Sequence, residues 1–137
     1  MVDYDTMFGH ASTLHQAALD VLHTPVLIHD HQRILYANIA ALGVLGARDE
    51  SQVVGRPIAE IVHPDGAQAG AARRQFVMEH GHAITGVPLK LMGVDGIVRY
   101  VTADAQAIHF AGDQTAILVT AVLTRMVDSK PRTTPPE

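Results

Sequence analysis

Residues 18–65 decide the fold and read ALDVLHTPVLIHDHQRILYANIAALGVLGARDESQVVGRPIAEIVHPD. β-Branched and aromatic residues in 26–30 and 33–37 predict two strands, and the polar residues 30–32 between them predict a turn. Asn38 is typical of a helix N-cap, because its side chain can accept a hydrogen bond from a backbone N–H of the first turn. Short helices should follow, with starts at Asn38, Asp49 and Pro57 and ends at Gly46 and Gly55.

The residues around the start of this block predict an amphipathic helix. Thr13 and Gln16 have the spacing of a capping box, and the helix should stop before Pro25. Apolar residues recur on one of its faces at helical spacing: Leu14, Ala17, Ala18, Val21 and Leu22. Such a face can cover the sheet of its own domain or pair with a second copy of the chain.

A longer helix is expected after the block. Asp65 and Gln68 again have capping-box spacing, and Gly81 is typical of the left-handed residue that ends a helix. Arg73 and Arg74 fall in the middle of this helix. Adjacent arginines usually form a solvated helix face; the alternative is a contact with an acidic partner or with a bound carboxylate.

In the last third of the chain apolar and polar residues alternate with the two-residue period of strands. Residues 83–92, 97–108 and 114–123 predict three strands, separated by the hairpin turns Asp95-Gly96 and Gly112-Asp113. Because Pro88 cannot donate a backbone hydrogen bond, the first of these strands should lie at a sheet edge or be bulged there. From residue 126 the composition becomes that of a linker or a disordered tail.

Composition excludes several classes of protein. The 137 residues, 47% of them apolar, suit one domain, and the net charge of -4 has no basic block for nucleic acid or an anionic membrane. The chain has no cysteine, which excludes disulfides, thiolate metal sites and a cysteine nucleophile. No apolar run reaches the roughly 20 residues of a membrane span. A cytoplasmic protein without direct membrane contact is expected.

Three stretches carry a resemblance to a known family: Tyr36-Ala37-Asn38, residues 53–65 (VVGRPIAEIVHPD) and the Asp95-Gly96 hairpin. In this order, over roughly residues 19–123, they resemble a PAS domain. The resemblance implies an α+β fold, a five-stranded antiparallel sheet with short helices over one face and an N-terminal amphipathic helix. The expected division is residues 1–12 as an extension, 13–125 as the PAS-like domain and 126–137 as a disordered tail or linker.

The resemblance also implies a class of role. PAS domains are sensory and interaction modules of signalling proteins such as two-component systems, so we expect signal transduction through a homodimer formed by the N-terminal helix. A downstream effector domain or a kinase is the second expected partner. No nucleophile, phosphate loop or acid-base pair is recognisable, so the chain is expected to be a regulatory part and not an enzyme.

A ligand pocket, if present, is placed by the resemblance between the helix of residues 65–81 and the inner faces of the last three strands. Its candidate residues are Phe76, Val87, Leu89, Leu91, Tyr100, Ile117 and Val119. The alternative is that these residues form an ordinary filled core, because apolar alternation predicts burial in either case.

Cofactors are weighed from the same residues. Without cysteine the flavin adduct of PAS photosensors is excluded, and few aromatic residues are present to stack on a flavin. Among the nine histidines the weak candidates for haem ligation are His63, His80 and His82. The pairs His29-x-His31 and His80-x-His82 are best explained as exposed residues and not as a metal site. The first expectation is no cofactor and no metal; the alternative is a sensor that binds haem or another cofactor and regulates a kinase, a cyclase or a transcription factor.

Overall fold

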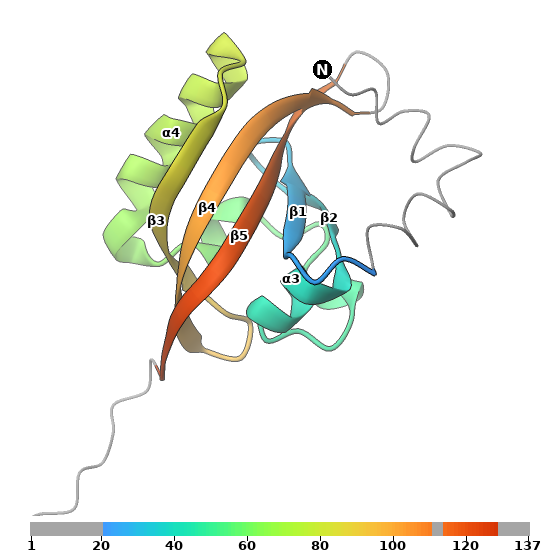
Figure 1. The fold of residues 1–137 in the computed structure, drawn as a ribbon, viewed down its shortest axis with the longest axis vertical. Coiled ribbons are helices and arrows are strands. Elements are labelled where there is room, and N and C mark those ends of the chain that lie inside the picture. The colour runs from blue at the N-terminus through green and yellow to red at the C-terminus, as the bar shows by residue number, and fades with distance from the viewer. Residues whose placement is uncertain (1–20, 111–113, 129–137) are drawn as a thin grey trace, which may run out of the picture.

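The computed structural model describes residues 21–110 and 114–128, in which one sheet is covered by helices on one face (Figure 1). The strands are β1 Val26–His29, β2 Ile34–Ala37, β3 Ile84–Met92, β4 Ile97–His109 and β5 Thr115–Asp128. They are antiparallel, in the order β2-β1-β5-β4-β3. The helices are α3 Ile39–Val44, α4 Ala67–His80 and the 3-10 helices η1 Glu50–Gln52, η2 Ile58–Ile61 and η3 Pro64–Gly66. The predicted α+β fold is confirmed.

Asn38 joins the first strands to the first helix, as its predicted capping role requires. Its Oδ1 accepts hydrogen bonds from the backbone N–H groups of Ala41 and Val26, both at 2.9 Å. Its Nδ2 donates to the carbonyl oxygen of Thr24 at 2.9 Å. The side chain is completely buried, and these bonds satisfy the amide oxygen twice and one of the two N–H groups of the amide nitrogen.

The start of α4 differs from the prediction. Asp65 does not cap this helix, which begins at Ala67 after an N-cap position at Gly66 that makes no side-chain hydrogen bond. The Asp65 carboxylate instead pairs with Lys90 Nζ at 2.8 Å, and this contact with β3 competes with the local cap. The C-terminal end is as expected: Gly81 has a φ of 69° and donates its N–H to the carbonyl of Val77.

The last three strands follow the sequence pattern, with one extension. β3 is an edge strand, as Pro88 requires, and its register shifts between Ile84 and Val87. β5 does not end at residue 123 but continues to Asp128, which pairs with Ile97 of β4. Residues 126–128, whose composition is that of the predicted tail, thus pair with β4 as the end of this strand.

Some predictions lie outside the described residues. These are the extension 1–12, the helix from Thr13 up to residue 20, the Gly112-Asp113 turn and the tail from 129 onward. Of the predicted dimer face, Val21 and Leu22 are described, and both are exposed. No helix in the described part of the chain is long and apolar enough to cross a membrane.

An ion pair within the β3–β4 hairpin lies against the end of α3. Arg99, 4% exposed, donates from Nη1 and Nη2 to the two carboxylate oxygens of Asp95 at 2.8 and 2.9 Å. The backbone N–H of Val94 donates to the carbonyl of Leu45 at 2.8 Å. Gly46, with a φ of 68°, leaves the space that the Asp95 carboxylate occupies, since a Cβ there would overlap it. The Asp95-Gly96 turn thus has a tertiary role besides its local one.

Replacement of Asn38 tests the junction. The variant Asn38→Ala should lower the free energy of unfolding by about 3 kcal/mol, because it removes a cap and leaves the buried N–H of Val26 without its acceptor. Urea denaturation measures the change. The control is Asp49→Ala, which removes the exposed cap of η1 and should cost clearly less. Equal losses in both variants would contradict the role given to Asn38.

Candidate functional site

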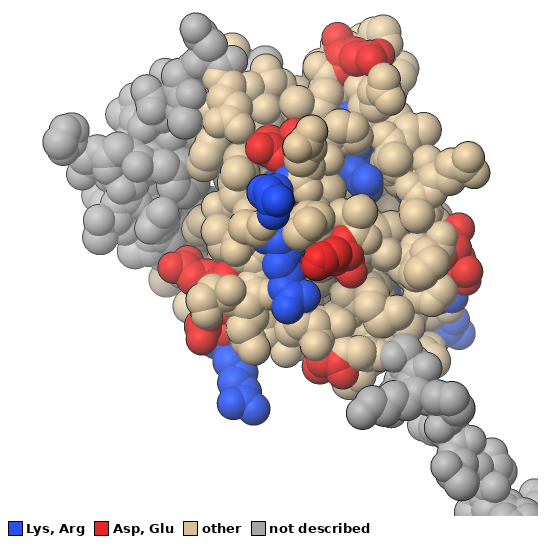
Figure 2. Space-filling view, turned by 180° about the vertical axis from the view of Figure 1, so that it is seen from behind, with Lys and Arg blue, Asp and Glu red and all other residues tan. Residues whose placement is uncertain are grey.

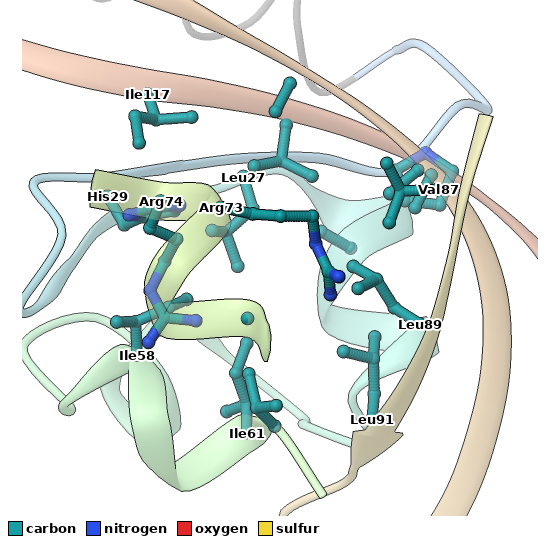
Figure 3. A pocket seen from close by; sticks show the side chains of 18 of the residues that line it. Leu27, His29, Ile58, Ile61, Arg73, Arg74, Val87, Leu89, Leu91 and Ile117 are labelled. Atoms are coloured by element: carbon teal, nitrogen blue, oxygen red, sulfur yellow. The ribbon is translucent and has the colours of Figure 1, made fainter. Parts of the chain in front are cut away.

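A cavity of about 120 Å³ lies between the helices and the inner face of the sheet (Figure 3). Leu27, Ile117 and Leu91 line it from the strands, and Ile58 and Ile61 line it from η2. Alanines of the neighbouring strands complete the sheet wall: Ala103, Ala105 and Ala121. Because these side chains are small, the space between α4 and the sheet is not filled by the protein itself.

Most of the predicted pocket residues line this cavity, and two do not. Val87, Leu89, Leu91, Ile117 and Val119 are part of its wall. The structure places the other two elsewhere, on the surfaces described next. The sequence pattern thus located the sheet wall more accurately than the helix wall.

Phe76 and Tyr100 face away from the cavity. Phe76 is 46% exposed and its ring lies 4.6 Å from that of His80. Tyr100 lies on the opposite face of β4, where the guanidinium of Arg125 stacks 4.3 Å from its ring centroid. Successive side chains of a strand point to opposite faces of the sheet. Because Val101 and Ala103 of β4 face the helices, Tyr100 must face the other way, and its prediction as a pocket residue is wrong.

The helix wall of the cavity is charged. Gly70, Arg73, Arg74 and Val77 follow the spacing i, i+3, i+4, i+7, so they share the face of α4 that is turned to the sheet. Figure 3 shows both arginine side chains extending from α4 toward the apolar lining. The interpretation of these arginines as a solvated face is wrong, because both are half-buried cavity residues. The residues three and four positions before the apolar Val77 lie on the same face of a helix, so this spacing alone could have predicted that both arginines face the sheet.

His29 is a third polar group of the cavity and was also misread as exposed. It is 2% exposed, and its Nδ1 accepts the backbone N–H of His31 at 3.1 Å. Burial, with further contributions from Arg74 and His31 and against that of Asp30, lowers the pKa of His29 to about 3. The imidazole is therefore neutral at physiological pH, and because Nδ1 is an acceptor, Nε2 carries the proton and can donate.

Neither arginine has an acidic partner in the described part of the chain. The ion pairs found there join His63 and Lys90 to Asp65, His80 to Glu79 and Arg99 to Asp95. Nε of Arg74 is buried and has no hydrogen-bond partner among these residues. Burial, and then the neighbouring charge of Arg73, lower the pKa of Arg74. The cavity thus holds two cations whose charge the described side chains do not balance.

The candidate haem ligands lie outside this cavity. His63 caps η3 by accepting the N–H of Asp65 at 3.1 Å, and His80 and His82 are exposed beside Phe76. Haem is also far larger than benzene, which needs a cavity of about 150 Å³. The residues of this cavity therefore do not fit haem. No group of three or more metal-binding side chains occurs in 21–110 and 114–128.

A surface groove of about 290 Å³ adjoins the cavity between α4 and β3. Val62, Arg73 and Leu89 line both spaces, and the ion pair of Lys90 with Asp65 lies in the groove wall. Arg73 therefore stands between the groove and the cavity. Figure 2 shows the face of the molecule opposite to that of Figure 1, where acidic and basic side chains are interspersed without a continuous patch of one sign.

The family of the chain follows from a match over most of its length. The family model of the PAS fold matches residues 13–121. The chain belongs to the PAS family. The resemblance given by Tyr36-Ala37-Asn38 and the Asp95-Gly96 hairpin is therefore confirmed, and the class of role is that of a sensory signalling module.

Solved structures show the same PAS fold at low identity. A PAS domain from Colwellia psychrerythraea is 16% identical with a TM-score of 0.68; the match covers 88% of this chain and 99% of that one. The PAS domain of nitrogen regulation protein NR(II) from Vibrio parahaemolyticus is 23% identical with a TM-score of 0.64, covering 81% and 98%. The PAS-B domain of Drosophila melanogaster Cycle, solved with bound ethylene glycol, is 14% identical with a TM-score of 0.64, covering 73% and 99%. No curated protein matches this PAS domain in sequence.

The buried imidazole of His29 gives a pH prediction for this PAS domain. A histidine whose folded pKa is depressed to about 3 binds a proton more readily when unfolded. Stability is therefore full above the unfolded pKa near 6.5 and falls toward lower pH, by up to about 1.4 kcal/mol per pH unit.

The variant His29→Asn tests this effect. An Asn oxygen can replace Nδ1 as acceptor for His31 but does not titrate, so the loss of stability between pH 6.5 and 4 should become shallower. Urea denaturation at several pH values measures it, with the exposed His109 on β4 as control through His109→Asn. An unchanged slope in His29→Asn would refute the assignment.

Proposed function

We propose that this PAS domain is a regulatory sensor that binds a small, largely apolar ligand in the cavity under α4 and relays its presence to a signalling partner such as a kinase. The observation that carries the proposal is the unfilled space itself. Protein interiors are normally packed to the density of organic crystals, yet small residues line this one where larger ones would close it: Ala103, Ala105, Ala121 and Gly70.

The position of the cavity supports a relay. Val77 of α4 packs on Ala107 and Ile117 of the sheet, at the side of the cavity. β5, which contributes Ile117, continues to Asp128 as the last described element. A ligand between α4 and β5 would therefore act on the strand that leads out of the domain. The comparison with PAS domains of a sensor histidine kinase and of NR(II) favours this class of partner.

Filling the cavity tests ligand binding. The variant Ala103→Ile should abolish the binding of 1-propanol and 1-butanol, which we expect to raise the melting temperature of the wild-type protein at millimolar concentrations. The variant itself should be about as stable as the wild type, because its added carbons occupy empty space. Differential scanning fluorimetry and isothermal titration calorimetry measure both effects.

The matched control is Thr102→Ile, the adjacent residue on the exposed face of the same strand. It should bind the two probes like the wild type. Binding that persists in Ala103→Ile, or wild-type protein that binds neither probe, would count against a ligand cavity.

Homodimerisation is the second proposed property, and exposed apolar residues support it. Val21 is 74% exposed and Leu22 is 46% exposed. The sequence pattern groups both with Leu14, Ala17 and Ala18 on one apolar face, although the structure places neither Val21 nor Leu22 in a helix. An exposed apolar pair that extends such a face is suited to contact a second copy.

Charge at this face should dissociate the dimer. We expect Val21→Asp and Leu14→Asp to shift the protein to a monomer in light scattering coupled to gel filtration, because a carboxylate would be buried without a partner. Val54→Asp, at another exposed apolar residue, should leave the mass unchanged. A wild-type monomer, or a dimer in both variants, would refute the interface.

A further inference from the structure

The face of α4 that covers the cavity carries charge where a packed helix carries apolar side chains. Arg73 and Arg74 lie on this face between Gly70 and Val77, opposite Leu27 and Ile117 of the sheet. An unpaired cation in an apolar wall costs stability, more so as it is desolvated. Such a conflict between burial and sequence is expected at functional sites, where another requirement outweighs stability.

The two guanidinium groups flank Gly70. A Cβ built on Gly70 would lie 3.2 Å from Nη1 of Arg74 and 4.0 Å from Nη2 of Arg73. The two nitrogens are therefore no farther apart than the sum of these distances. Two like charges on the same partly buried helix face repel each other, and a single anion in contact with both would relieve the repulsion and could supply the hydrogen-bond partner that Nε of Arg74 lacks.

We infer that the cavity binds a short aliphatic monocarboxylate, whose carboxylate pairs with Arg73 and Arg74 and whose alkyl tail lies among the apolar side chains of the sheet. This inference rests on the ligand-binding function proposed above. The planar guanidinium donates two parallel hydrogen bonds to a carboxylate, a geometry that no uncharged ligand group reproduces. No acidic residue of the described chain lines the cavity to compete with the ligand.

The remainder of the lining sets the kind of tail. Apart from the arginines and the Nε2–H of neutral His29, the residues around the cavity are apolar, so a second carboxylate would be buried there without a partner. The cavity of about 120 Å³ is somewhat smaller than the roughly 150 Å³ that holds benzene. A tail of about three to five carbons therefore fits, and a dicarboxylate or a long fatty acid does not.

The groove beside α4 offers the route of entry. Arg73 lines both the groove and the cavity, so it can meet the anion at the surface and hold it as the tail passes inward. Arg74, whose Nε is fully buried, lies deeper. In this arrangement Arg73 binds the carboxylate at the entrance of the cavity, and Arg74 binds it inside.

The test compares carboxylates with uncharged molecules of the same shape. Isothermal titration calorimetry of the whole protein with butyrate and pentanoate should show saturable binding, about ten- to a hundred-fold tighter than butyramide or 1-butanol. Octanoate, succinate and inorganic phosphate should bind more weakly than butyrate. The melting temperature should rise with butyrate concentration.

Two variants assign the head group, and one serves as control. Arg73→Met and Arg74→Met should each weaken butyrate about ten- to a hundred-fold, while 1-butanol, which needs only the cavity, is retained. Arg74→Met should unfold at the same or a higher temperature than the wild type without ligand, because an unpaired, partly buried charge is gone, and Arg73→Met, at the mouth of the cavity, should unfold at about the same temperature. Arg56→Met removes an exposed arginine away from the cavity and should change neither binding nor stability.

The outcomes separate this inference from the proposed function. Equal affinity for butyrate and butyramide, or unchanged butyrate binding in both arginine variants, overturns the carboxylate while 1-butanol binding still supports the cavity. Phosphate that binds as tightly as butyrate overturns the alkyl tail and leaves an anion at the groove. Failure of every probe, uncharged ones included, overturns both. Variants that lose butyrate and also lose stability would make the arginines structural.

Discussion

The arrangement of β1, α3 and the cavity wall that they form depends on the hydrogen bonds of the buried Asn38 side chain. Its Oδ1 accepts hydrogen bonds from the N–H of Val26 at the start of β1 and from the N–H of Ala41 in α3. Its Nδ2 donates a hydrogen bond to the carbonyl oxygen of Thr24. These bonds place β1 and α3 relative to each other. Leu27, His29 and Ala41 then line the cavity, so its walls are set by a group that does not itself touch it.

A second polar junction holds the opposite side. Arg99 pairs with Asp95 inside the β3–β4 hairpin, Gly46 leaves room for the carboxylate, and the N–H of Val94 joins the hairpin to the carbonyl of Leu45 at the end of α3. The hydrogen bonds between Arg99 and Asp95 lower the pKa of Asp95 to about 2, so the pair stays charged at physiological pH. In contrast to the arginines of α4, the buried cation here has a bidentate partner. The buried cation of the frame is therefore paired, whereas the two arginines in the wall of the otherwise apolar cavity have no acidic partner among the described residues.

The apolar core and the face of α4 with the two arginines differ in how much their burial stabilises the domain. The core around Ile34, Leu45 and Val53 is fully buried and apolar. α4 instead presents Gly70, Arg73 and Arg74 to the sheet and reaches apolar packing at Val77. Such a helix gains less from burial than one with a continuous apolar stripe, and in the proposed sensor an anion would complete its contact with the sheet. Ligand binding would then be read as tighter packing of α4 on β5.

The sequence by itself determined the features whose cause lies within a few residues. Asn38 caps a helix, Gly81 ends one, Pro88 lies on an edge strand and Asp95-Gly96 makes a hairpin, because each of these depends on local backbone geometry. Only the tertiary structure decided the rest. Asp65 pairs with Lys90, which is distant in sequence, and does not cap α4. Arg73, Arg74 and His29 line the cavity because α4 and β1 face each other there, whereas Phe76 is exposed. Burial depends on what lies opposite a side chain, and no local pattern contains that information.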